Sequence, residues 1–412
     1  MSKPVYELAA VIREYKTSFI AKHQPLKQHL RVLNAIEKCR TAALGGHVDA
    51  CDSCGHVRIS YNSCRNRHCP KCQGTNREKW IAARQEQLLP VSYFHVVFTL
   101  PQELNSWCMH YPKEMYDLLF AASKQTITTF AQDEKHLGAS PGMISVLHTW
   151  GQNLSLHPHI HMIVPSGGIT AAGYWKNAKC QGNYLFPVKA MSIVFKNKYM
   201  EGFLKFIQTQ NSSIEKSVRE TLYNKSWVVY AKQPFGGPAQ VIEYLGRYTH
   251  KVAISNHRIL SIADGKISFM YKDYADGCRQ KQMPLEATEF LRRFCMHILP
   301  PGFRKIRHYG FLANTNRAML QVQQKEMPAC RQGRGVAAAV TIKKDPIAIG
   351  WKTIAREKMN YDVDECPCCK KGRMITLLHF DANAPPPVWV LKKIAMQKSE
   401  TAPSFFLMTT PA

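Results

Sequence analysis

Three histidines recur at every second position of the segment Leu156–Val164 and could bind a metal ion. They are His157, His159 and His161. On a β-strand, side chains two residues apart point to the same face and lie roughly 6–7 Å apart. Two neighbouring imidazoles can therefore share one ion, while the outer two cannot. The alternative is a structural cluster of histidines that is hydrogen-bonded inside a core.

Two tyrosines further along the chain could supply a nucleophile. Tyr244 and Tyr248 are four residues apart, which places both phenols on one face of a helix, with Arg247 and Lys251 nearby. A free phenol has a pKa of about 10, and a neighbouring cation or metal ion favours the reactive phenolate. A metal ion can also polarise a phosphate that the phenolate attacks. Taken alone, such a pair is also typical of packed aromatic side chains.

The composition favours a polyanionic partner. The 412 residues include 55 Lys and Arg against 29 Asp and Glu, a formal net charge of +26, which indicates nucleic acid more than a membrane surface. No run of about eighteen apolar residues predicts a membrane span, and the first residues do not form a signal peptide. The 14 cysteines are partly clustered, which is typical of metal binding in a reducing compartment such as the cytoplasm.

Two Cys-x-x-Cys pairs separated by fourteen residues predict a structural zinc site. Its four expected ligands are Cys51, Cys54, Cys69 and Cys72. Cys64 and His68 lie between the pairs and could replace a ligand or contribute to a second, weaker site. The basic residues Arg65, Arg67 and Lys71 surround this module and could contact DNA.

A second cysteine cluster lies near the carboxyl end of the chain. Cys366-Pro367-Cys368-Cys369 resembles one half of a zinc-binding pair of turns, and the sequence shows no partner pair for it. His379 is a candidate partner. Whether Cys366 and Cys369 bind metal stays open at this point.

The apolar periodicity predicts a mixture of helices and strands without a regular strand–helix–strand alternation. The expected helices cover 5–22, 25–43, 75–89, 113–136 and 188–209. The expected strands cover 93–100, 143–150, 156–164 and 227–231, and a hairpin covers 258–262 and 266–271. This pattern favours an α+β fold in which helices flank an antiparallel sheet.

Three domains are expected in this order along the chain. Residues 1–90 form amino-terminal helices and a zinc-ribbon module, and residues 91–283 form the catalytic domain. Residues 284–412 form a basic, mostly helical region with the second cysteine cluster and a loosely ordered tail. Basic residues that alternate with aromatics in the last domain, among them Arg304 and Arg307, are candidates for lining a nucleic-acid channel.

Several long motifs, taken in order, resemble one family. They are Phe94–Pro101, Leu156–His161, Tyr244-x-x-x-Tyr248, Arg247–Asn256 and Arg307–Asn314, together with the cysteine module that ends at Cys72. In this order they resemble the HUH endonucleases (histidine, bulky apolar residue, histidine). More narrowly, the chain resembles the two-tyrosine rolling-circle transposases of bacterial insertion sequences.

The resemblance implies specific roles for residues that match the motifs. His159 and His161 would hold a catalytic Mg²⁺ or Mn²⁺, and Tyr244 and Tyr248 would be the nucleophiles. The third metal ligand stays open among Gln152, Gln240, His250 and His95. Structural Zn²⁺ would occupy the cysteine module, and the partners would be single-stranded DNA at the element ends and target DNA.

We therefore expect a metal-dependent transposase that nicks and transfers single-stranded DNA through a 5′-phosphotyrosine, in the bacterial cytoplasm. A plasmid replication initiator or a conjugative relaxase would use the same chemistry in a different biological setting. A third possibility is a non-catalytic zinc-ribbon protein that binds DNA and in which the histidines are structural. The sequence leaves open the oligomeric state, the end and target sequences and the separate roles of the two tyrosines.

Overall fold

The computed structural model describes residues 4–85, 87–179, 185–232, 246, 248–274, 276–327, 351–384 and 386–400. The chain forms two compact units, and each joins segments that are distant in sequence. The first contains Met1–Leu30 and Asn76–Asp345, and the second contains Arg31–Thr75 and Pro346–Ala412. The three consecutive domains expected at 1–90, 91–283 and 284–412 are thus regrouped, because the cysteine module is completed by the carboxyl-terminal segment.

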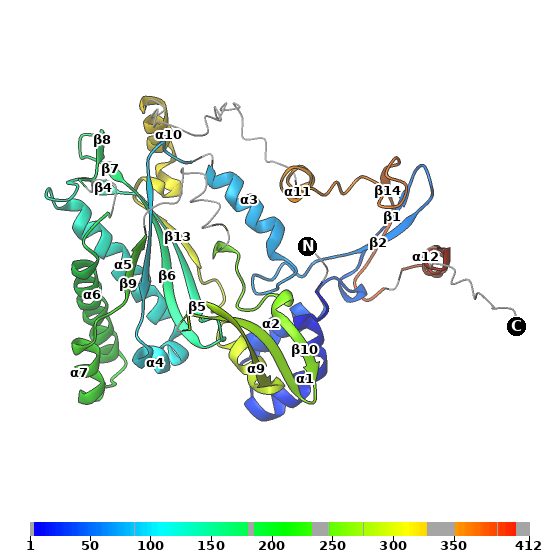
Figure 1. The fold of residues 1–412 in the computed structure, drawn as a ribbon, viewed down its shortest axis with the longest axis horizontal. Helices are drawn as coiled ribbons and strands as arrows, with labels where there is room; N and C mark the ends of the chain where they lie inside the picture. The colour runs from blue at the N-terminus through cyan, green and yellow to red at the C-terminus, as the bar shows by residue number, and fades with distance from the viewer. Residues whose placement is uncertain are drawn as a thin grey trace, which may run out of the picture. The chain divides into compact units, whose positions relative to one another are not determined.

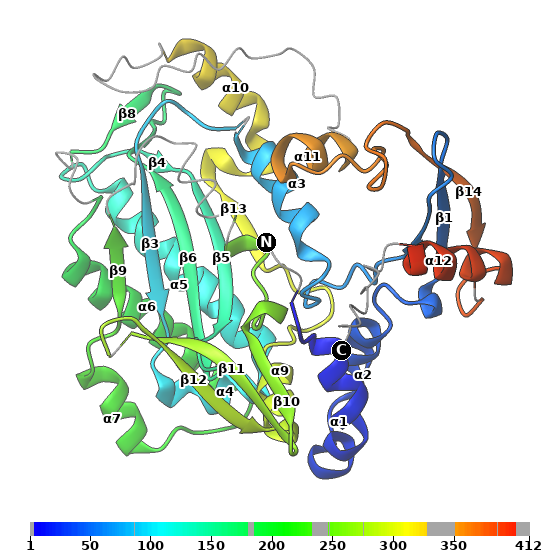
Figure 2. The same cartoon turned by 45° about the vertical axis from the view of Figure 1, so that its right-hand side comes forward.

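The first unit is built on a five-stranded sheet in which every strand is antiparallel to its neighbours. The order is β13 (Ile306–Tyr309), β5 (Met143–Trp150), β6 (Leu156–Pro165), β3 (Tyr93–Thr99) and β9 (Val229–Lys232). Helices flank this sheet (Figures 1 and 2), so the predicted α+β class is confirmed.

The two faces of this sheet differ in chemistry. Along β6, Ile160, Met162 and Val164 are buried in the main hydrophobic core, which helices α5 (Pro112–Gln132) and α6 (Val188–Thr209) complete. Side chains alternate between the faces of a strand, so His159 and His161 point away from that core. The sequence of β6 reads as mostly apolar for two reasons. One face of the strand packs against helices, and the other face carries polar side chains over only part of its length.

The first unit contains further strands and helices. The Asp264-Gly265 turn has positive φ at both residues (51° and 70°), as expected for a tight hairpin between β10 (Ile259–Ala263) and β11 (Lys266–Asp273). The other helices are α1 (Leu8–His23), α2 (Lys27–Glu37, which continues into the second unit), α3 (Gln73–Gln85), α4 (Asn105–His110) and α7 (Lys216–Asn224). Short strands β4 (Ser140–Pro141), β7 (Gly167–Ile169) and β8 (Trp175–Asn177) form a separate sheet.

The segment 284–327 is less helical than expected. It contains the end of β12 (Arg279–Glu286), helix α9 (Ala287–Cys295), strand β13 and helix α10 (Arg317–Glu326). Strand β13 pairs with β5 and so belongs to the five-stranded sheet of the first unit, which the basic composition of the segment did not indicate. Within the described residues, no helix combines the length and the apolar character that crossing a bilayer requires.

The second unit contains a three-stranded antiparallel sheet assembled from both ends of the chain. Strand β1 (Gly46–Cys51) lies between β2 (Val57–Tyr61) and β14 (Met374–Phe380). Helices α11 (Trp351–Met359) and α12 (Val388–Glu400) belong to the same unit. Helix α12 corrects the expectation of a loosely ordered tail as far as residue 400, because Val390 is fully buried against Val48 and Val57.

Candidate metal and tyrosine site

Three histidines converge on the polar face of the central sheet. His159 and His161 come from β6, and His148 comes from β5, where it lies directly opposite His159 in the antiparallel register. Each offers a ring nitrogen, and the three nitrogens lie within 4.8 Å of one another. The sequence interpretation identified His159 and His161 but missed His148. The third member of the predicted trio, His157, is exposed and lies outside this group.

Each of these three imidazoles also contacts a second group through its other nitrogen. His159 Nδ1 lies 2.6 Å from the carbonyl of His157, and His148 Nε2 lies 2.7 Å from the carbonyl of Tyr248. His161 Nδ1 lies 2.9 Å from His95 Nε2. A carbonyl only accepts, so the first two nitrogens are protonated donors and the opposite ring nitrogens are left for a metal. Such outer contacts are typical of metal-binding histidines.

Three of the other candidate third ligands have different contacts. His95 contacts His161 and supports it from outside the group. The Gln152 side chain donates to the Tyr274 hydroxyl, and His250 contacts the Thr249 hydroxyl. Gln240 lies outside the described residues.

Burial keeps the three imidazoles in the neutral form that binds metal. His148 and His161 are 3% and 8% exposed, and desolvation lowers the pKa of each well below its usual value. Desolvation likewise lowers the pKa of His159 to about 4. Three neutral imidazoles fit zinc, manganese or iron, and a shell completed by phosphate and water oxygens makes Mg²⁺ or Mn²⁺ suitable as well.

Tyr248 lies directly at this histidine group. Its ring centroid is 4.4 Å from that of His161 and 5.7 Å from that of His148, and the side chain is partly exposed. Since its carbonyl also accepts from His148, the backbone that carries the phenol is fixed to a metal-ligand candidate. The structure thus brings His159, His161 and Tyr248 together. Tyr244 and Arg247 lie outside the described residues.

Two lysines bring positive charge to the same place. Lys251 Nζ lies 5.6 Å from the Tyr248 ring centroid, and Lys305 Nζ donates to the Lys251 carbonyl. Arg304 is exposed, as a phosphate contact requires. Arg307, in contrast, forms an ion pair with Asp117 and lies 4.0 Å over the Phe120 ring, so its guanidinium serves packing within the unit.

The predicted four-cysteine site is corrected by the structure. Cys51 and Cys54 do not share a site with Cys69 and Cys72. Two groups of four sulfurs form instead, each with all its sulfurs within 4.8 Å. The first group is Cys39, Cys64, Cys69 and Cys72. The second group is Cys51, Cys54, Cys366 and Cys369.

The structure shows the surroundings of Cys64 and His379, whose roles the sequence left open. Cys64, which was left over between the pairs, belongs to the first group, while the isolated Cys39 was missed because it is in no Cys-x-x-Cys pair. His379, the candidate partner of Cys366 and Cys369, instead packs its ring against His47.

The basic residues of the second unit are partly exposed. Arg65 is exposed, and its positive φ of 52° places it in a turn. Arg67 donates to His68, and the carbonyl of Lys71 accepts from Arg40. All three lie in the turn region that carries Cys64, Cys69 and Cys72.

Comparisons with known proteins agree with the motifs. A family described as "Putative transposase" matches residues 142–319, and a "Transposase zinc-binding domain" matches residues 11–100. "Putative transposase y4qJ" of Sinorhizobium fredii is 42% identical over 404 residues, which cover 94% of this chain and 99% of the relative. The transposase for insertion sequence element IS801 of Pseudomonas savastanoi is 30% identical over 288 residues, covering 67% of this chain and 68% of the relative.

Among solved structures, the chain shows a distant likeness to the conjugative relaxase TrwC in complex with oriT DNA. The metal-free complex has a TM-score of 0.23 at 8% identity and covers 38% of this chain and 71% of the relaxase chain. The family of this chain follows from four matches: the near full-length match to y4qJ, the match to the IS801 transposase and the two domain matches. The chain belongs to the two-tyrosine insertion-sequence transposases that carry an amino-terminal zinc-binding domain.

Proposed function

We propose that this transposase cuts and rejoins single-stranded DNA at the ends of its element, in a rolling-circle mode, with Tyr248 as a nucleophile. The observation that carries this proposal is the position of the Tyr248 ring, 4.4 Å from the ring of His161 and beside a group of three histidines. A packed structural tyrosine would not need a cluster of neutral imidazoles at its side.

The catalytic metal would be held by His148, His159 and His161, whose ring orientation is fixed by the contacts described above. A divalent ion bound there would polarise the scissile phosphate and stabilise its developing charge. We assign the third ligand to His148, which lies with His159 and His161, and not to Gln152, His250 or His95.

The residues of the chain supply the covalent chemistry. The Tyr248 oxygen loses its proton and forms a bond to phosphorus, while the bond from phosphorus to the 3′ oxygen breaks and that oxygen takes up a proton. The 5′ phosphate stays on the tyrosine, and a 3′ hydroxyl reverses the step on the next strand. Lys251, 5.6 Å from the ring centroid, favours the phenolate electrostatically. Tyr244 stays our candidate for the second nucleophile.

The partner fits the charge of the protein. A net charge of +26 favours a polyanion, and Lys251, Lys305 and Arg304 place cationic groups near the histidines or in the segment that leads into β13. A structural zinc ion would occupy Cys39, Cys64, Cys69 and Cys72, which all lie within the matched zinc-binding domain. Reduced cysteines of this kind fit the bacterial cytoplasm.

The test is the formation of a covalent protein–DNA adduct. Wild-type protein, Mn²⁺ or Mg²⁺ and labelled single-stranded element ends should give a labelled band that survives denaturing electrophoresis. Tyr248→Phe should remove the adduct formed at this tyrosine, and His148→Ala should lower adduct formation at least tenfold by weakening metal binding. Tyr223→Phe, at an exposed tyrosine of α7, is the matched control. A wild-type adduct that peptide mapping places on a residue other than Tyr248, with an undiminished yield in Tyr248→Phe, would refute the assignment.

A further inference from the structure

The second group of cysteines joins the two ends of the chain. Cys51 ends β1 and Cys54 lies in the turn that leads to β2, while Cys366 and Cys369 lie in the turn before β14. Sulfurs from the two ends of the chain lie close together in two pairs. Cys51 Sγ is 3.7 Å from Cys369 Sγ, and Cys54 Sγ is 3.7 Å from Cys366 Sγ.

These separations are those of thiolates that share a tetrahedral ion. With Zn–S bonds of about 2.3 Å, the edges of a tetrahedron of sulfurs measure about 3.8 Å. A disulfide would require the two sulfurs to lie about 2.05 Å apart. The Cys39 group, in the matched zinc-binding domain, has comparable sulfur separations of 3.5 Å and 3.6 Å.

The backbone of both turns is arranged to stabilise sulfur in the charged form. The amides of Ser53 and Cys54 each donate to Cys51 Sγ at 3.4 Å, and the amide of Gly372 donates to Cys369 Sγ at 3.4 Å. Amide donors favour the thiolate over the neutral thiol, and the thiolate is the form that binds metal. Each Cys-x-x-Cys turn therefore has its own donors, as expected of two equivalent halves of one site.

The two turns are in direct contact. A Cβ at Gly372 would lie 2.4 Å from Cys51 Sγ and 2.6 Å from Ser53 Cβ, so only glycine allows this approach. Asp52 and Arg373 exchange hydrogen bonds across the contact. The Asp52 amide donates to the Arg373 carbonyl at 3.0 Å, and the Arg373 amide donates to Asp52 Oδ1 at 2.8 Å.

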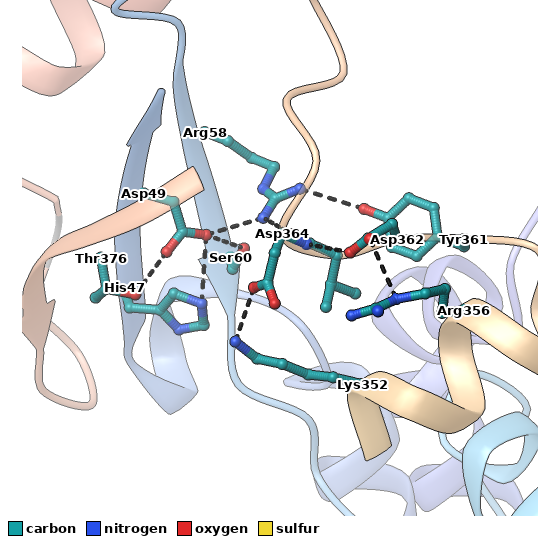
Figure 3. A network of polar contacts seen from close by, with 11 residues as sticks. His47, Asp49, Arg58, Ser60, Lys352, Arg356, Tyr361, Asp362, Asp364 and Thr376 are labelled. Atoms are coloured by element: carbon teal, nitrogen blue, oxygen red, sulfur yellow. Dashed lines mark hydrogen bonds and ion pairs between the residues drawn. The ribbon is translucent and has the colours of Figure 1, made fainter. Parts of the chain in front are cut away.

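A polar network that contains no sulfur holds the same two segments together (Figure 3). Asp49 of β1 is 4% exposed and accepts from Thr376 of β14 at 2.9 Å and from Arg58 of β2 at 3.1 Å. Arg58 also donates to the Tyr361 hydroxyl and the Val363 carbonyl. The convergence of the four sulfurs is therefore part of a built interface within the second unit.

We propose that Cys51, Cys54, Cys366 and Cys369 bind a second structural zinc ion, which fastens the carboxyl-terminal segment to the β1–β2 hairpin. The matched zinc-binding domain covers residues 11–100 and contains only half of these ligands. The zinc-binding unit of this transposase is accordingly completed by residues about 300 positions downstream in the sequence, and it holds two zinc ions.

Metal analysis of the intact purified chain tests this proposal. The wild-type protein should contain two zinc ions per chain, and Cys366→Ser should contain one. Cys368→Ser is the matched control, since Cys368 is an exposed cysteine of the same turn that belongs to neither group, and it should retain two. Cys72→Ser should lose the other ion, and Cys72→Ser with Cys366→Ser should lose both.

A second pair of measurements guards against simple misfolding. Cys366→His replaces the sulfur ligand by a ring nitrogen, which also binds zinc, so this variant should recover the second zinc ion. Hydrogen exchange should show that Cys366→Ser accelerates exchange in β1, β2 and β14 while the five-stranded sheet of the first unit stays protected. One zinc ion in the wild-type protein, iron in place of zinc, a disulfide among these four cysteines, or two zinc ions in Cys366→Ser would each overturn the proposal. Its failure would leave the tyrosine assignment intact, because the adduct assay reads the first unit.

Discussion

His95 should control metal affinity without binding the metal itself. It lies on β3, is 7% exposed and contacts Nδ1 of His161 at 2.9 Å. If His161 binds metal through Nε2, its Nδ1 carries the proton and His95 Nε2 accepts it. Replacing His95 by phenylalanine keeps an aromatic ring of similar size and removes the acceptor.

The expected cost follows from the burial of His161. An unsatisfied donor in a buried setting costs about 1–3 kcal/mol, and loss of an outer contact to a metal-binding histidine typically lowers metal affinity 10–100-fold. The two ranges agree, because 10–100-fold corresponds to about 1.4–2.7 kcal/mol. We therefore expect His95→Phe to raise the Kd for Mn²⁺ at the histidine site by 10–100-fold.

Titration of free Mn²⁺ by electron paramagnetic resonance measures this Kd in the intact protein. His136→Phe makes the same change where a histidine packs against Phe130 and Phe186, and it should leave the Kd as in the wild type. His95→Gln retains an acceptor and should recover part of the loss. A His95→Phe protein that is folded and binds Mn²⁺ within a factor of about two of wild type would refute the supporting role of His95.

Two further changes test other contacts. Gly246→Ala places a Cβ 2.3 Å from the Ile81 side chain, so it should displace the segment that leads to Tyr248. The yield of covalent DNA adduct should fall several-fold while the Mn²⁺ affinity stays unchanged. A yield equal to that of the wild type would contradict this prediction. Burial alone would raise the pKa of Asp49, but hydrogen bonds from Thr376 and Arg58 outweigh it and hold the pKa below its usual value. Because the pKa of Asp49 is depressed in the folded protein, the ionised carboxylate stabilises the fold above about pH 4, and this stabilisation is lost as the pH falls further. Asp49→Asn should remove that pH dependence from hydrogen exchange in β14.

The central sheet could be predicted because its strands are locally consistent. The run at 93–100 is β-branched and aromatic and is closed by Pro101, and helix α6 was predicted at 188–209 with the bounds that the structure has. Both elements bury one side in the same core, so their periodicity is strong. The segment after residue 284 was predicted as mostly helical, and β13 was missed because a strand of four residues leaves little periodicity in the sequence.

The missed residues of the sites depend on contacts between distant positions. His148 is a lone histidine in an apolar strand, and only the register of the β5–β6 hairpin places it opposite His159. The turn at Gly151 and the alternation of side chains along both strands could have predicted that His148 and His159 share a face. An irregularity between His148 and Trp150 shifts the register and makes the exact pairing harder to predict. Cys39 has no neighbouring cysteine, so no spacing rule could identify it.

The cysteine groups differ in how far apart their ligands are in the chain, and this difference bears on how the second unit assembles. The contact between Cys39 and Cys72 spans 33 residues, and the contact between Cys51 and Cys369 spans 318. Closing the longer loop in a flexible chain costs about 2 kcal/mol more. The Cys39 group can therefore assemble early in folding. Cys51 and Cys54 must stay as free thiols until residues 366–369 reach them. A folded first unit, which occupies most of the sequence between them, shortens the effective loop and removes much of that cost.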